Sequence, residues 1–367
     1  MRRLVVAALA AAALSLTACA PATSSPEDGG IEVAAERPPL SELATAGDPH
    51  SIEGPSTAVL ADAAVEPVVT DPAQSLPVTV TSHDLTGDVE VTVVDTSRII
   101  AMDLSGSLAA TVWGLGLGGD LVGRDVSTTF PGAADLPVVT GSGHTVNAES
   151  IIGLAPTLVI TDGSIGPVDV VQQLRDVGIT VVFVERSASF DGAADLARSV
   201  GEVLGVAEAG EQLAQRIVSE VDETRAQIAA LAPEAASERL RMVFLYLRGT
   251  AGVYYLFGSE SGADQLITAL GGVDVAGELG WNGMQPLTDE AMVAADPDLI
   301  LVMTGGIESV GGVDGLLADK PAIALTTAGQ HRRFVDMADG QILSFGPRSA
   351  GVLDALARAV YAPAPAS

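Results

Sequence analysis

The sequence predicts an α/β protein of two lobes, each with a central, largely parallel sheet flanked by helices, joined by one long helix. Three observations lead to this fold class. Short β-rich runs alternate with helix-like stretches in both halves of the chain, which is typical of βα units. A long, Ala-rich helical stretch from residue 190 to about residue 231 separates the halves, and one sequence unit occurs once in each half.

The first half carries the alternation from about residue 91 onward. We expect β-branched and apolar runs to form strands at Arg98–Met102, Leu121–Arg124, Leu158–Ile160 and Thr180–Val184. The stretches between them predict helices at Leu108–Leu117, Ala148–Leu154 and Val168–Val177. The central helical stretch is interrupted around Gly201–Gly205 and ends before Pro233, because proline stops a helix.

The second half repeats the alternation. Strands are expected at Met242–Leu247, Val253–Leu256, Leu299–Met303 and Arg333–Met337. Helices are expected at Ala263–Leu270, Asp289–Ala294 and Ser349–Tyr361. Two lobes joined by a single rigid helix predict little hinge motion and a ligand site in the cleft between the lobes.

A repeated unit links the two halves. Residues 147–160 (NAESIIGLAPTLVI) match residues 288–301 (TDEAMVAADPDLIL) position by position. Each unit reads as a short helix with an acidic first turn, a proline turn and an apolar strand. We therefore predict one such unit in each lobe.

The N-terminus predicts export. Arg2 and Arg3 precede an apolar stretch from Leu4 to Leu14, which is too short for a spanning helix, so residues 1–18 read as a signal peptide. Leu16-Thr-Ala-Cys19 resembles the lipobox of bacterial lipoproteins, in which the cysteine is lipidated. The alternative is an ordinary signal peptide with a chance cysteine. The prediction is an extracytoplasmic protein anchored to the cell membrane through Cys19.

Composition bears on partners and on the segment after the anchor. The chain has 47 acidic and 18 basic residues and a net charge of −29, which argues against nucleic acid and anionic membrane surfaces as partners. Residues 19–89 are rich in Pro, Ala, Ser and acidic residues, which predicts a disordered linker with His50 and His83 exposed to solvent. The remaining boundaries are 90–205 for the N-terminal lobe, 206–233 for the connecting helix and 234–367 for the C-terminal lobe.

The repeated unit is also the most diagnostic trait of a known family. Over roughly residues 95–362 the chain resembles class III solute-binding proteins of ABC importers, which take haem, cobalamin and iron-siderophores. Within that class it is similar to the actinobacterial haem-binding lipoproteins. Three segments carry this likeness: Gly141-Ser-Gly-His144-Thr, Leu245-Tyr246-Leu-Arg248-Gly, and Phe345-Gly-Pro-Arg348-Ser.

The resemblance implies that His144 and Tyr246 are axial ligands of ferric haem b from opposite lobes, with Arg248 supporting the tyrosine. Imidazole and phenolate are both established haem ligands, and a nearby cation favours phenolate. Arg248 follows Tyr246 by two residues on a predicted strand, so both side chains should share one face. Without the resemblance, His144 could be a turn residue and Tyr246 a half-buried strand tyrosine.

For several other residues the sequence leaves more than one role possible. Met303 is either a cleft residue, an alternative weak ligand or a core methionine. Arg348 is expected either to pair with a propionate or to cap the last helix. Glu149 and Glu290 occupy matching positions in the repeated units, and the resemblance implies that they dock on the importer's permease subunits, although the helix dipole alone favours such glutamates. Candidate walls for a flat macrocycle are Trp281, Met284, Tyr254 and Tyr255.

The leading hypothesis is therefore a binding protein, not an enzyme, that captures haem and delivers it to an importer. A siderophore or a corrinoid is the alternative cargo, although few basic residues are available for an anionic siderophore. A third alternative is a secreted hydrolase or haem-processing enzyme, but the sequence shows no recognisable arrangement of nucleophile and base. An adhesin or structural lipoprotein is the remaining alternative.

Overall fold

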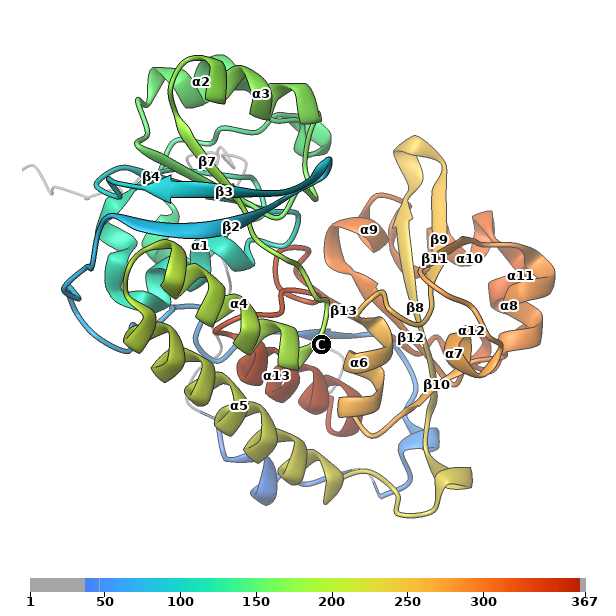
Figure 1. Cartoon of the computed structure of the whole chain (residues 1–367). Coiled ribbons are helices and arrows are strands. Elements are labelled where there is room, and N and C mark those ends of the chain that lie inside the picture. Colours follow the sequence, from blue (N-terminus) through green and yellow to red (C-terminus); the bar gives the residue numbers. More distant parts are fainter. Residues whose placement is uncertain (1–36, 46, 364–367) are drawn as a thin grey trace, which may run out of the picture. The chain divides into compact units, whose positions relative to one another are not determined.

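The computed structural model describes residues 37–45 and 47–363, and it contains two separate sheets flanked by helices (Figure 1). The first sheet is entirely parallel, with the strand order β5-β4-β6-β7. Its strands are β4 (Ile99–Met102), β5 (Leu121–Arg124), β6 (Leu158–Thr161) and β7 (Thr180–Phe183). Its helices are α1 (Ser107–Val112), α2 (Ala148–Gly153) and α3 (Val168–Asp176). The fold predicted for this lobe is confirmed.

The second sheet has the order β1-β13-β12-β8-β9-β11, with β10 also paired to β8. It is parallel from β1 to β8, whereas β9 and β11 run antiparallel to their neighbours. Its strands are β1 (Ser56–Ala58), β8 (Arg241–Arg248), β9 (Val253–Phe257), β10 (Val273–Asp274), β11 (Met284–Pro286), β12 (Leu299–Met303) and β13 (Phe334–Met337). Its helices are α6 (Ala263–Ala269), α7 (Val275–Glu278), α8 (Asp289–Ala295), α9 (Thr304–Glu308), α10 (Gly312–Asp319), α11 (Pro321–Ala324) and α12 (Thr327–His331).

A layer of three longer helices accompanies the two sheets (Figure 1). It consists of α4 (Phe190–Val203), α5 (Ala207–Ala229) and α13 (Ser349–Tyr361), and α5 packs against both of the others. Gly201 and Gly210 allow α4 and α5 to cross closely, because a Cβ on Gly201 would lie only 2.8 Å from the Cα of Gly210. The predicted long helix and its interruption near Gly205 are confirmed.

The predicted disordered linker is wrong over residues 37–89, and its remaining part lies outside the described residues. Leu40, Leu60, Ala63 and Val65 are almost fully buried. Ser56–Ala58 adds strand β1 to the C-terminal lobe beside β13. The following segment, residues 59–72, then reaches the N-terminal lobe, where the backbone N–H of Val68 donates to the carbonyl of Gly114 at 2.8 Å. We call residues 59–72 the strap.

A hairpin follows the strap. Strands β2 (Val78–Asp84) and β3 (Gly87–Val93) pair antiparallel, and the hydroxyl of Ser82 accepts a hydrogen bond from the backbone of Phe183 on β7 at 2.9 Å. His83 lies on this hairpin 3.0 Å from Asp88, and His50 lies 3.7 Å from Asp298, so both histidines have partners rather than lying in a linker.

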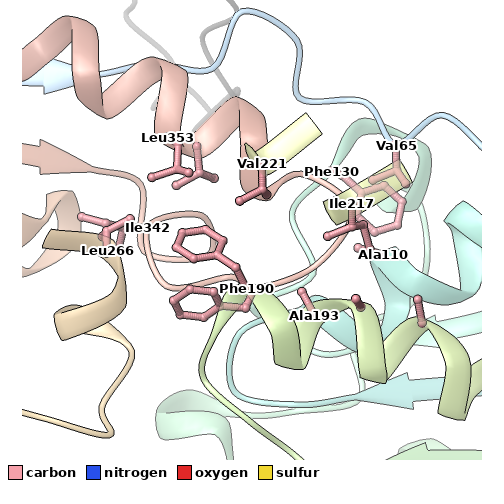
Figure 2. Packing of buried hydrophobic residues seen from close by; sticks show 14 of the residues in the cluster. Val65, Ala110, Phe130, Phe190, Ala193, Ile217, Val221, Leu266, Ile342 and Leu353 are labelled. Atoms are coloured by element: carbon pink, nitrogen blue, oxygen red, sulfur yellow. The ribbon is translucent and has the colours of Figure 1, made fainter. Parts of the chain in front are cut away.

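One hydrophobic core extends across elements that are distant in the sequence. Figure 2 shows part of it, drawn from the strap, from α1, α4, α5, α6 and α13 and from the intervening loops. Its labelled members are Val65, Ala110, Phe130, Phe190, Ala193, Ile217, Val221, Leu266, Ile342 and Leu353. The strap is therefore part of the folded body. In the part of the chain that the structure describes, no helix is long and apolar enough to cross a membrane.

Candidate functional site

Tyr246 lies near the end of β8, on the sheet face that meets the large core. Strand alternation places Tyr246 and Arg248 on this face, whereas Leu245 and Leu247 are buried in a second core on the opposite face. The Tyr246 ring stacks on Phe257 of β9, with 5.7 Å between ring centroids and 21° between planes. Tyr255 is the direct cross-strand partner of Tyr246. The phenol is half-buried and lies on a rigid strand.

Arg248 is placed beside Tyr246, as the two-residue spacing predicts. Its guanidinium carbon lies 4.8 Å from the centroid of the Tyr246 ring, within cation–π range. The same guanidinium donates to Asp339 at 2.7 Å and lies 3.8 Å from the sulfur of Met303. Met303 ends β12 and packs against the same core as Tyr246, which places it at the site.

His144 comes from the other lobe. It ends the 3-10 turn Ser142–His144 with a φ of 60°, a left-handed conformation that is unusual for a non-glycine residue. Its Nδ1 lies 3.4 Å from the hydroxyl of Ser127. Burial and then the charge of Arg248 lower the pKa of His144, whereas Asp339 acts in the opposite direction. Two charged residues of the C-terminal lobe therefore contribute to the pKa of this N-terminal-lobe histidine.

Two buried carboxyls shape the loops next to His144. Asp103 follows β4 and Asp125 follows β5, and the backbone N–H of Asp103 donates to Asp125 at 2.9 Å. Asp125 also accepts from the backbone of Thr128 at 2.7 Å, which holds the loop that carries Ser127. Burial and then repulsion from Asp162 raise the pKa of Asp103, whereas burial and then repulsion from Asp103 raise the pKa of Asp125 to about 7.

Sequence reasoning missed several residues at this site. Asp339 lies 91 residues from Arg248, and no local pattern links the two. Ser127 donates to the carbonyl of Leu104 at 2.7 Å while facing His144. The apolar residues Leu104 and Val126 are 44% and 45% exposed and adjoin Ser127, Leu104 through its carbonyl and Val126 as its chain neighbour.

The predicted cleft walls divide between the two sheet faces. Met284 is 60% exposed and pairs with Phe257, so it lies on the same face as Tyr246 and Tyr255. Tyr254 lies on the opposite face, where its hydroxyl donates to Asp319 at 2.7 Å and its pKa is raised to about 12 by burial and by that carboxylate. Trp281 packs against the same second core as Tyr254. The prediction that Tyr254 is a wall is therefore wrong, because strand alternation in β9 directs it away from Tyr246, whereas the wall role of Trp281 stays a prediction.

Arg348 is buried at the start of α13. Its guanidinium donates to the carbonyl of Gly340 at 3.4 Å and lies 5.9 Å from the centroid of the Phe130 ring. Among residues 37–45 and 47–363, its Nε and Nη1 have no hydrogen-bond partner, and burial lowers the pKa of the guanidinium to about 10. The side chain does not cap α13, so the capping alternative is wrong.

The repeated unit has the same local structure in both lobes. Asn147 caps α2 by accepting from the backbone of Ser150 at 3.0 Å, and Thr288 caps α8 by accepting from the backbone of Ala291 at 3.1 Å. Each helix leads through a proline turn to a buried parallel strand, β6 or β12. Glu149 and Glu290, the matching first-turn glutamates of these helices, are both exposed.

The arginine that begins each lobe's sheet anchors its unit. Arg98 donates to the carbonyl of Ala155 at 2.9 Å, after α2, and Arg241 donates to the carbonyl of Ala295 at 3.3 Å, at the end of α8. The matching helices are therefore held in the same way. The lipidation residue predicted from the sequence, Cys19, lies outside the described residues.

Comparisons with known proteins agree with this fold. Residues 103–339 match the family described as Periplasmic binding protein. A curated relative, the uncharacterized ABC transporter substrate-binding lipoprotein YvrC of Bacillus subtilis (strain 168), is 26% identical over 252 residues, covering 68% of this chain and 76% of the relative.

Solved structures are more similar. The heme binding protein HmuT, in an arginine-to-alanine variant, is 41% identical with a TM-score of 0.82, covering 88% of this chain and 97% of that chain. The periplasmic heme-binding protein RhuT from Roseiflexus sp. RS-1, in apo form, is 36% identical with a TM-score of 0.66, covering 73% and 98%. The family match and the helix-joined two-lobe architecture agree, and this chain belongs to the periplasmic binding protein family, in its class III.

Proposed function

We propose that this protein captures ferric haem b between its lobes, with His144 and Tyr246 as axial ligands and Arg248 supporting the tyrosine, and delivers it to an ABC importer. The observation that supports the proposal is the pairing of Tyr246 with Arg248 near the end of β8, together with the lowering of the pKa of His144, in the other lobe, by burial and by the charge of Arg248. One ligand from each lobe suits a flat macrocycle held between them.

The chemistry of the site favours ferric haem. Phenolate is a hard anionic ligand that stabilises the ferric form, and imidazole is an established partner. A free tyrosine ionises near pH 10, so phenolate ligation at neutral pH requires the metal and a nearby cation, a role that Arg248 fills at 4.8 Å. Burial and then the charge of Arg248 lower the pKa of His144, which favours the neutral imidazole whose lone pair can bind iron.

The similar structures support this cargo. HmuT, RhuT and the periplasmic heme-binding protein HutB of Vibrio cholerae are all named for haem binding. HmuT has been solved as separate alanine variants of a histidine, a tyrosine and an arginine. The replaced tyrosine and arginine are two residues apart, the same spacing as Tyr246 and Arg248 here.

Apolar side chains at the site suit the macrocycle. Tyr255, Met284 and Met303 share the sheet face of Tyr246, and Leu104 and Val126 flank Ser127 near His144. Met303, whose sulfur lies 3.8 Å from the Arg248 guanidinium, is proposed as a pocket residue or an alternative weak ligand. Arg348 is proposed as a partner of a propionate, since its buried guanidinium has two unpaired nitrogens among the described residues.

The proposal extends to location and partner. Signal-peptide cleavage before Cys19 and lipidation of that cysteine would tether the protein outside the cytoplasm. The relative from Bacillus subtilis is named as a substrate-binding lipoprotein, which supports this anchoring. Glu149 and Glu290 would dock on the two permease subunits, because each is exposed at the same position of its lobe.

The test is a hemin titration of the protein without its first 19 residues, followed by visible absorbance. Wild-type protein is expected to give a saturable one-to-one Soret change with phenolate charge-transfer bands. Tyr246→Phe should lose those bands, and His144→Ala should change the Soret maximum. Tyr254→Phe is the matched control, because Tyr254 lies on the opposite sheet face, and it should behave as wild type.

The absence of a saturable change in the wild-type protein would refute haem capture. The family would stand, and titration with ferric siderophores and corrinoids would then identify the cargo. The family and the similar structures are binding proteins rather than enzymes, so no turnover is expected.

A further inference from the structure

The ion pair between Arg248 and Asp339 is not accounted for by the proposed haem ligation. The Arg248 guanidinium and the Asp339 carboxylate lie 2.7 Å apart, and the two residues come from the end of β8 and from the loop after β13. Their side chains are 29% and 37% exposed. An isolated pair with this exposure stabilises a fold only slightly, so stability alone is a weak reason for it.

The first turn of α9 contacts both members of the ion pair, Arg248 and Asp339. The backbone N–H of Gly305 donates to the second carboxylate oxygen of Asp339 at 2.8 Å. A Cβ on Gly305 would lie 3.0 Å from an oxygen of Asp339, and a Cβ on Gly306 would lie 3.2 Å from Nη1 of Arg248. Two successive glycines therefore leave the space in which the carboxylate and the guanidinium meet.

The carboxylate is consequently the fixed member of the pair. One of its oxygens is held by main chain and the other faces Arg248, whereas the arginine is a long side chain at the end of a strand. Arginine loses less freedom when its planar group is held by a fixed acceptor. The cation–π contact with Tyr246 depends on that placement, because it weakens as the cation leaves the ring face.

The neighbouring charges do not offer Arg248 another anchor. Asp336 on β13 already accepts from Thr304 at 2.6 Å and from Thr57 at 2.9 Å. The only other contact of the Arg248 guanidinium with an oxygen acceptor among the described residues is the carbonyl of Leu247, its chain neighbour, at 3.0 Å.

We propose that Asp339 is a positioning residue that acts through Arg248, holding the guanidinium against Tyr246 both before and after the ligand is bound. The ligand-bound half of this statement rests on the proposed haem function. The part that concerns the ligand-free protein does not rest on that function, since it concerns only the placement of Arg248.

The haem-free test uses nuclear magnetic resonance of arginine Nη–H groups in the protein without its first 19 residues. Wild-type protein should show a protected Arg248 signal, identified by its loss in Arg248→Lys. Asp339→Ala should broaden or abolish that signal, and Asp339→Glu should restore it in part. Asp314→Ala is the matched control, because it removes a carboxylate 2.7 Å from Arg332 in the same lobe, and it should leave the Arg248 signal intact. An unchanged Arg248 signal in Asp339→Ala would refute the proposal.

The haem-loaded test measures hemin release to an excess of a high-affinity acceptor protein. Asp339→Ala should release hemin about two- to fivefold faster, the range expected for a half-exposed ion pair. Asp339→Ala added to Arg248→Ala should produce no further change. Slower release, or an equal acceleration in both backgrounds, would show that Asp339 acts as a competing charge or independently of Arg248.

The two tests separate the possible failures. A wild-type protein that binds no hemin would refute the proposed function, and the resonance measurement would still decide whether Asp339 anchors Arg248. Hemin binding with an unchanged Arg248 signal would leave the function standing and remove the role of Asp339.

Discussion

Replacing Leu60 by alanine tests the finding that the strap belongs to the folded body. Leu60 is 1% exposed and packs beside Gly351 of α13, where a Cβ on that glycine would lie 3.6 Å from its side chain. A disordered linker predicts no effect on stability, whereas a buried core residue predicts a large one. The two accounts of residues 59–72 therefore differ in a measurable quantity.

The magnitude follows from the atoms removed. Leucine to alanine deletes three carbons, and burial of each is worth about 0.8 kcal/mol, which amounts to about 2.4 kcal/mol. The cavity left behind adds to this, so we expect the free energy of unfolding to fall by about 3 kcal/mol. With a urea m-value of about 3 kcal/mol/M, the unfolding midpoint should fall by about 1 M.

The assay is urea unfolding followed by circular dichroism and by tryptophan fluorescence. Leu85→Ala is the matched control, because Leu85 also lies in the range predicted as linker but is 59% exposed, and its effect should stay within about 0.5 kcal/mol. Equal midpoints for wild type and Leu60→Ala would refute the packing described for the strap.

Two further predictions concern pH and docking. Asp125 stays protonated in the folded state up to about pH 7 but ionises near pH 4 in the unfolded state, so its stabilising contribution is present below about pH 4 and is lost between about pH 4 and 7. The urea midpoint should therefore decline over this range, and the decline should be smaller in Asp125→Asn than in wild type. An equal decline in the two proteins would contradict the raised pKa of Asp125. Charge reversal at Glu149 and Glu290 together should leave hemin binding unchanged and abolish stimulation of importer ATPase activity in reconstituted vesicles. The control Glu223→Lys, on α5, should preserve that stimulation. Full stimulation by the double variant would exclude the docking role.

Much of the fold was predictable because its elements carry strong periodicity. The strand predicted at Arg98–Met102 is β4, and the break predicted near Gly205 falls between α4 and α5. Parallel strands buried on both faces read as continuous apolar runs, and amphipathic helices read as period-3.6 patterns. Both signals are local, so they survive without tertiary information.

The strap had no such signal. It is a segment without helix or strand whose buried apolar residues, Leu60, Ala63 and Val65, join the core at irregular spacings. Composition therefore resembled a disordered linker. The hairpin β2–β3 does carry an alternation of valines, and β3 begins at Gly87 with a φ of 122°.

The site was predictable where strand geometry determines it. The spacing of Tyr246 and Arg248 places both on one face, and the structure agrees. Asp339 was not predictable, since its approach to Arg248 depends on how β13 and α9 meet in three dimensions. Tyr254 was misplaced because the face that a residue of β9 occupies depends on its register with β8, which the sequence does not reveal.

The connection between the lobes through β1 and the strap has a consequence for release of the ligand. Strand β1 joins one lobe, and the strap that follows it bonds to the other, so the chain passes between the lobes more than once. A ligand site between lobes joined in this way would be preorganised, and preorganised sites bind tightly because little freedom is lost on capture. The same rigidity makes spontaneous opening rare. We therefore expect the protein to retain its cargo until the importer pulls the lobes apart, which would place control of unloading with the transporter rather than with the carrier.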